Sequence, residues 1–154
     1  MDLELLRRID LFSNLRGDQL SRIAAIAVGE EVPRGEVLFE EGEHGSDIYV
    51  IADGRVRISK IIPGIGEEAL AILSTGAYFG EMEFIDRDLA RAARATVHER
   101  ALLYTFSYAE LDELLEADSD IALAITSSML RTFSRRLRST NDKVTAMFAM
   151  AQFK

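Results

Sequence analysis

The sequence contains no cysteine and no tryptophan, and it has only two prolines and two histidines among 154 residues. Without cysteine there can be no disulfide, no thiolate chemistry and no cysteine-based zinc site. No apolar run approaches the length that crosses a bilayer. The opening MDLELLRRID contains acidic residues and lacks the apolar stretch of a secretory signal. These absences favour a cytoplasmic protein that makes no contact with membranes.

Positive charge is also scarce. The chain carries 18 basic and 26 acidic side chains, which gives a net charge of -8. Such a surface repels nucleic acid unless a basic patch is reserved for it. The only candidate patch is the segment 131–138, with four arginines, and we favour the solvated face of a helix as its explanation. A helix-turn-helix would need further residues after this segment, so we expect no direct DNA binding.

Residue patterns of catalysis and metal binding are missing as well. His44 lies in a glycine-flanked turn and His98 follows an alternating run, and two isolated histidines do not form the metal cluster of a jelly-roll enzyme. We expect both at the surface. No nucleophile elbow, P-loop or dinucleotide-binding glycine motif is present. The sequence therefore predicts a protein that is not an enzyme and that holds no metal and no cofactor.

The hydrophobic pattern indicates one domain over residues 1–154, because this length suits a single core. Residues 1–27 have helical spacing, residues 28–106 form short alternating runs separated by turns, and residues 107–154 return to helical spacing. Many short strands at even spacing predict an antiparallel arrangement. The predicted fold is mainly β with flanking helices: an antiparallel β-roll (double-stranded β-helix or jelly roll) with N-terminal helices and a long C-terminal helix.

Local signals predict individual helix ends and turns. Residues 2–9 and 18–27 are the expected N-terminal helices, and Asp18 is a plausible cap for the second one. The pair Asp53-Gly54 stands between two alternating runs and is a strong hairpin signal.

The last segment predicts two helices. Ser107 is a suitable cap for a helix to about Glu116, and Ser119 or Asp120 begins a long helix that continues close to the C-terminus. A heptad-like stripe of mostly apolar residues follows the long helix: Leu130, Phe133, Leu137, Thr140, Val144, Met147 and Ala151. One small domain can hardly cover so long a helix, so we favour a homodimer seam over packing on the chain's own strands.

The most informative segment is 79–97, FGEMEFIDRDLARAARATV. Gly80 follows an alternating run and opens a short helical turn, whose free N–H groups can hold an anion. Glu81 at the same place suits a ligand hydroxyl, because a carboxylate accepts hydrogen bonds from groups such as a ribose 2′-OH. Arg91 is a forked cation that suits the two free oxygens of a phosphate. A ligand with a phosphate and a sugar hydroxyl would satisfy both side chains.

Strand alternation predicts which arginine of this segment faces inward. Arg91 shares one face with the alternate residues up to Val97, and that face is otherwise apolar, whereas Arg94 shares the polar face. A buried arginine needs an anion beside it. That anion is either Glu81 in the empty protein or a bound phosphate, and a plain Arg91–Glu81 ion pair on a roll that binds nothing is the structural alternative.

The segment resembles the phosphate-binding cassette of the cyclic nucleotide-binding domain family. The family pattern F-G-E-[LM]-x-[LF], a short loop and R-[STA]-A corresponds to residues 79–84 and 91–93. The stretches LFSNLRGDQL and GEVLFEEGEHGSDIYVIADGRVRI resemble the family's N-terminal helical entry and its strand–turn–strand signature. The stretch SRRLRSTNDKV resembles the long helix of the bacterial catabolite activator branch. The resemblance covers most of the chain.

The resemblance implies a role for each residue of the cassette. Backbone N–H groups around Gly80 and Met82 would hold the sugar and the phosphate, and Ala92 would offer its own N–H to the phosphate. Glu81 would accept a hydrogen bond from the ribose 2′-OH. Arg91 would neutralise the cyclic phosphate.

The resemblance also implies contacts to the base. Ala71 and Leu73 would line the wall beside it. Thr140 and Asn141 on the long helix match positions that touch the adenine edge, one of them from a neighbouring subunit. Arg136 is a candidate partner for Glu81.

Two positions depart from the family pattern. Ala92 stands where bacterial activators place a hydroxyl residue, and the loss of that hydroxyl favours cAMP over cGMP as the ligand. Glu83 stands where small residues are common, and it would weaken phosphate binding if it faced inward. We therefore predict a cAMP sensor that changes its C-terminal helix or dimer seam and acts on a partner protein. The alternative is a degenerate roll that binds no nucleotide and serves oligomerisation.

Overall fold

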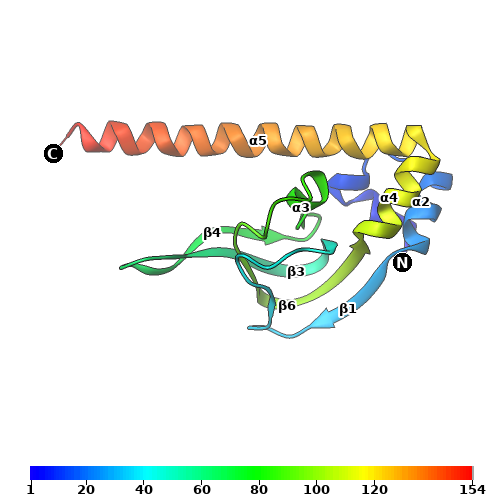
Figure 1. Cartoon of the computed structure of the whole chain (residues 1–154), viewed down its shortest axis with the longest axis horizontal. Coiled ribbons are helices and arrows are strands. Elements are labelled where there is room, and N and C mark those ends of the chain that lie inside the picture. The colour runs from blue at the N-terminus through cyan, green and yellow to red at the C-terminus, as the bar shows by residue number, and fades with distance from the viewer. Residues whose placement is uncertain (154) are drawn as a thin grey trace.

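The computed structural model describes residues 1–153. Figure 1 shows a roll of strands with short helices gathered at one end, and one long helix that lies across the roll and extends past it. The N-terminal helices are α1 (Leu3–Arg7), the 3-10 helix η1 (Asp10–Phe12) and α2 (Gly17–Ala25). The prediction that Asp18 caps α2 is wrong. The helix begins at Gly17, and the backbone N–H of Arg16 donates to the side-chain oxygen of Gln19 at 2.9 Å.

Within residues 1–153, six antiparallel strands form the roll. They are β1 (Val28–Val32), β2 (Val37–Phe39), β3 (Asp47–Ile62), β4 (Gly66–Ser74), β5 (Tyr78–Phe79) and β6 (Arg94–Ser107). The main path of hydrogen-bonded neighbours is β1-β6-β3-β4, while β2 pairs with β6 and β5 pairs with β3. The predicted class, an antiparallel β-roll with N-terminal helices and a long C-terminal helix, is confirmed.

The pair Asp53-Gly54 does not form the predicted hairpin turn. It lies inside β3, where the pairing with β6 changes register. Gly54 has a φ of +92°, and a Cβ at this position would clash with the carbonyl oxygen of Arg100. The positive φ that signals a hairpin therefore serves a β-bulge, which bends a 16-residue strand. The chain reverses later, between Ile62 and Gly66.

Two apolar cores divide the molecule. One joins the N-terminal helices to β3, β6, α4 (Tyr108–Ala117) and the first part of α5 (Ser119–Ala151). The other fills the inside of the roll. Tyr78 belongs to the first core and Phe79 to the second, because successive strand residues point to opposite faces. Gly80 therefore lies at the boundary between the two cores, and the cassette begins there.

The C-terminal helices begin close to where the sequence predicts. The side chain of Ser107 caps α4 by accepting a hydrogen bond from the amide of Glu110, as expected. Helix α5 begins at Ser119, and Asp118 caps it by accepting from two amides of its first turn. The buried residues of α5 all lie in its first part: Ile121, Ile125, Ser128, Met129 and Thr132.

Within residues 1–153, the second part of α5 has no buried residue. Leu137, Val144 and Met147 of the predicted stripe are 62%, 44% and 70% exposed. Phe133, from the same stripe, packs against the chain's own core instead. Although α5 has 33 residues, neither it nor any other helix within residues 1–153 has an apolar stretch that could cross a membrane.

Asp118→Ala removes the cap of α5 and the ion pair with Arg22. Hydrogen bonds from the amide of Ile121, from the amide of Asp120 and from the side chain of Arg22 hold the pKa of Asp118 below its usual value of 3.8. The carboxylate therefore stabilises the fold above that pH, and the stabilisation is lost as the pH falls through the lowered pKa. We expect the variant to melt below the wild type at neutral pH, and the difference to shrink in acid, in thermal unfolding followed by circular dichroism.

The matched control is Asp142→Ala, which removes an exposed carboxylate from the middle of the same helix. It should melt close to the wild type. Equal losses in the two variants would contradict a capping role for Asp118.

Candidate functional site

A cavity of about 380 Å³ lies between the roll, α3 (Met82–Ile85) and α5. The predicted site residues that line it are Ala71, Leu73, Gly80, Glu81, Met82, Arg91, Ala92 and Thr140. Asn141 is exposed and does not line the cavity. Arg136, Thr140 and Lys143 lie on the face of α5 that lines the cavity. Successive helical residues are turned by about 100°, so Asn141 lies on a different face.

Gly80 turns the chain from β5 into α3. Its φ is +82°, and a Cβ there would lie 2.7 Å from Nη1 of Arg91 and 3.0 Å from the carbonyl oxygen of Asp47. The position therefore requires glycine both for its backbone angle and for space. Gly45 approaches the same guanidinium, since a Cβ there would lie 2.5 Å from Cζ of Arg91. The backbone thus closes on Arg91 at two places where no side chain fits.

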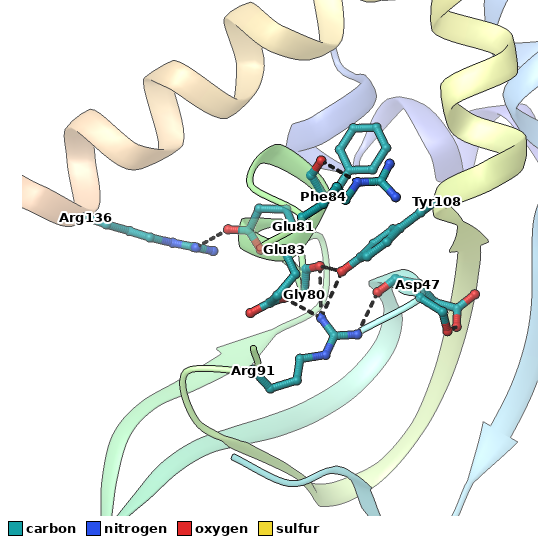
Figure 2. A network of polar contacts seen from close by, with 10 residues as sticks. Asp47, Gly80, Glu81, Glu83, Phe84, Arg91, Tyr108 and Arg136 are labelled. Atoms are coloured by element: carbon teal, nitrogen blue, oxygen red, sulfur yellow. Dashed lines mark hydrogen bonds and ion pairs between the residues drawn. The ribbon is translucent and has the colours of Figure 1, made fainter. Parts of the chain in front are cut away.

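Arg91 is buried, as strand alternation predicts, with an exposed fraction of 4%. Figure 2 shows groups from several elements converging on its guanidinium. Its Nη1 donates to the Glu83 carboxylate at 2.8 Å, to the Gly80 carbonyl at 3.0 Å and to the Tyr108 hydroxyl at 3.1 Å. Its Nη2 donates to the Asp47 carbonyl at 3.0 Å. Four acceptors therefore meet the two Nη atoms of the guanidinium.

The carboxylate that meets Arg91 is Glu83, so the suggested pairing with Glu81 is wrong. Glu81 pairs with Arg136 of α5 at 2.6 Å, which agrees with the partner that the sequence suggests. Residues two apart on a helical turn are separated by about 200°, so the two carboxylates point in different directions (Figure 2). Glu83 is 4% exposed and faces inward, which answers the question that the sequence leaves open.

Arg91 lies just before β6 rather than in it. Its amide donates to the carbonyl of Glu43 at 2.7 Å, and its carbonyl accepts from the amide of Gly42 at 2.8 Å. Arg94, the first residue of β6, is partly exposed and pairs with Glu40 at 2.7 Å. Strand alternation predicts the directions of Arg91 and Arg94 correctly. It applies to Arg91, although this residue lies outside β6, because the two backbone hydrogen bonds hold Arg91 beside Gly42 and Glu43.

Two aromatic side chains of the site escape the sequence analysis. The ring of Phe39 lies 4.1 Å from Cζ of Arg91, a cation–π contact. The hydroxyl of Tyr108 donates to the carbonyl of Gly80. Burial raises the pKa of Tyr108 to about 12, so this hydroxyl keeps its proton at neutral pH. Tyr108 is three residues before the buried Leu111 in α4, and this helical spacing is the signal that could have identified it.

The histidines take no part in this site. His44 is exposed and His98 is half-buried, and neither lines the cavity. Within residues 1–153 there is no group of three or more side chains that could hold a metal ion.

Comparison with known proteins gives one family. The model described as "Cyclic nucleotide-binding domain" matches residues 29–118. Over 142 residues, the chain is 29% identical to a "CRP-like cAMP-activated global transcriptional regulator" of Mycobacterium tuberculosis, covering 92% of this chain and 61% of the regulator. This chain thus spans about three fifths of that relative's length.

Solved structures show the same similarity. A cyclic nucleotide-binding domain from Methylobacillus flagellatus superposes with a TM-score of 0.81 and 25% identity, covering 92% of this chain and 79% of that one. The catabolite activator protein of Thermus thermophilus superposes with a TM-score of 0.76 and 25% identity, covering 90% of this chain and 62% of that one. The match extends through the flanking helices as well as the roll.

Tyr108→Phe tests whether the buried hydroxyl supports the site. The change removes the hydrogen bond to Gly80 and one acceptor of Arg91, so we expect a loss of about 1–3 kcal/mol in the free energy of unfolding. Urea denaturation measures it. Tyr104→Phe is the control, because the Tyr104 hydroxyl forms no hydrogen bond with another described residue. Equal stability of the two variants would contradict this role.

Proposed function

Since this chain belongs to the cyclic nucleotide-binding domain family, we propose that it is a regulatory domain that binds cAMP in the cavity around Arg91. The observation that carries the proposal is the buried guanidinium, which lines the cavity and whose Nε has no hydrogen-bond partner within residues 1–153. A buried donor without an acceptor is unfavourable, and a phosphate oxygen is a strong acceptor. A volume of about 380 Å³ also suits a small-molecule site.

The cassette supplies the remaining contacts to the sugar and the phosphate. Glu81 accepts the ribose 2′-OH, while backbone N–H groups near Gly80 and Met82 bind the sugar and the phosphate. The amide of Ala92 is available to the phosphate, because it donates to no other described residue. Since Ala92 has no hydroxyl to offer a guanine, cAMP binds better than cGMP.

The base lies against β4 and α5. Ala71 and Leu73 form its apolar wall, and Thr140 reaches its edge from α5. Asn141 points away from the cavity of its own chain, so it contacts the base only from a second subunit. Ligand binding and dimerisation are then linked.

The ion pair between Glu81 and Arg136 offers a route to regulation, because it joins α3 to α5 directly. A ribose hydroxyl on Glu81 shares this carboxylate with Arg136, so the ligand is placed to change the position of α5. Such a shift requires that cAMP bind the two arrangements with different affinity. The changed helix or dimer seam is then the surface that a partner protein recognises.

A degenerate oligomerisation module that binds no nucleotide is the second candidate. It is favoured by the Glu83 carboxylate, which already occupies Arg91, and by the exposed apolar stripe on α5. The two candidates differ in one property, the binding of cAMP.

Isothermal titration calorimetry with cAMP and cGMP tests the proposal. We expect the wild type to bind cAMP more tightly than cGMP. Arg91→Ala should weaken cAMP binding by at least about a hundredfold, because two hydrogen bonds from a charged donor are lost, each of about 1.5–3 kcal/mol. Arg91→Lys keeps the positive charge but loses the forked pair of donors. Its affinity for cAMP should lie between those of the wild type and Arg91→Ala.

Arg94→Ala removes a nearby arginine that pairs with Glu40 outside the cavity. Its affinity for cAMP should match that of the wild type. If the wild type gives neither heat nor a thermal shift with cAMP or cGMP, the oligomerisation module becomes the better account.

Leu137→Asp tests the dimer seam. Leu137 is 62% exposed on the stripe of α5, and a charge buried between two helices destabilises their contact. Light scattering after size-exclusion chromatography should give a dimer for the wild type and a monomer for the variant. Ala146→Asp places the same charge on the opposite side of the helix and should stay dimeric. A monomeric wild type would contradict the seam.

A further inference from the structure

Glu83 is a buried carboxylate that lines the cavity. The proposed cAMP contacts do not involve it. Its side chain is 6% exposed, and it contacts the guanidinium of Arg91 at 2.8 Å. Both side chains line the cavity. Figure 2 shows Glu83 reaching from α3 to Arg91, while Glu81 turns toward Arg136 on α5.

While Glu83 stays in place, its carboxylate occupies the Nη1 side of Arg91, and a second anion has to share the guanidinium with it. Nη1 carries three acceptors, and one of them, Glu83, is a full negative charge. Nη2 is bonded to the Asp47 carbonyl, and only Nε lacks a partner among the described residues. The charge of Arg91 is therefore already neutralised by a group of the protein itself.

A phosphate on the same guanidinium would lie within a few ångströms of the Glu83 carboxylate. Two like charges at that distance repel each other strongly where water is excluded. The phosphate binds fully to Arg91 only when the carboxylate moves away from the guanidinium. This movement opposes binding.

We propose that Glu83 is an internal competitor for the phosphate subsite, which holds Arg91 in the empty domain and sets a low affinity for cyclic nucleotide. This inference rests on the proposed function. Glu83 is a positioning residue, because it acts through Arg91. Its contact stabilises the empty domain and is given up when the phosphate enters.

Glu83→Gln tests the proposal, because glutamine has the same shape and its amide oxygen still accepts from Arg91. We expect the variant to bind cAMP at least tenfold more tightly than the wild type in calorimetric titration. We also expect the ligand-free variant to melt at a lower temperature, since the buried guanidinium loses its counter-charge. If Glu83 had only a structural role, its replacement would lower both the melting temperature and the affinity for cAMP. A lower melting temperature together with a higher affinity therefore identifies a competitor.

Asp88→Asn is the matched control. It removes one negative charge from an exposed position between Glu83 and Arg91 in the chain, and its side chain has no hydrogen bond to a described residue. Its affinity for cAMP should stay within about twofold of the wild type. A gain as large as that of Glu83→Gln would mean that net charge alone is responsible, and it would overturn the inference.

The remaining outcomes separate this inference from the proposed function. If the wild type binds cAMP and Glu83→Gln binds no more tightly, the competitor role is overturned and the proposed function stands. If only the variant binds, the inference holds and Glu83 silences the site in the wild type. If neither binds at millimolar cAMP, both are overturned.

Discussion

The burial of one guanidinium, that of Arg91, is the constraint on which the site depends. A cation with 4% exposure is tolerated only where acceptors surround it. These acceptors come from the turn after β5 (Gly80), from α3 (Glu83), from α4 (Tyr108) and from the start of β3 (Asp47). Segments that are distant in the sequence are therefore fixed to one another by a single side chain. The same charge is what makes the cavity suitable for an anionic ligand.

Much of the fold could be predicted, because it follows from hydrophobic periodicity and turn chemistry, which are local. The errors arise where a local signal has two structural uses. The pair Asp53-Gly54 indicates a position with a positive φ. A hairpin turn and the bulge inside β3 both use this angle at Gly54. Most of the predicted site residues line one cavity, but the predicted partner of Arg91, Glu81, is wrong. Both carboxylates are buried, and which of Glu81 and Glu83 faces Arg91 depends on the phase of a four-residue helix, which the sequence does not define.

Helix α5 connects the site to the exterior of the domain. Its first part is anchored in a core, whereas Leu137, Val144 and Met147 of the stripe are exposed. Between these parts, Arg136 reaches down to Glu81. Under the proposed function, a helix that is anchored in its first part and bonded to the cavity near its middle would change position with the state of the site. Ligand binding and assembly would then be coupled.

The most direct test of the central claim is the Nε–Hε signal of Arg91 in ¹H–¹⁵N NMR spectra recorded during a titration with cAMP. The signal is assigned by its loss in Arg91→Lys. This N–H has no acceptor within residues 1–153, so a bound phosphate should move its proton resonance strongly downfield as a hydrogen bond forms. A signal that stays in place at cAMP concentrations where calorimetry shows binding would contradict the assignment of Arg91 as the phosphate ligand.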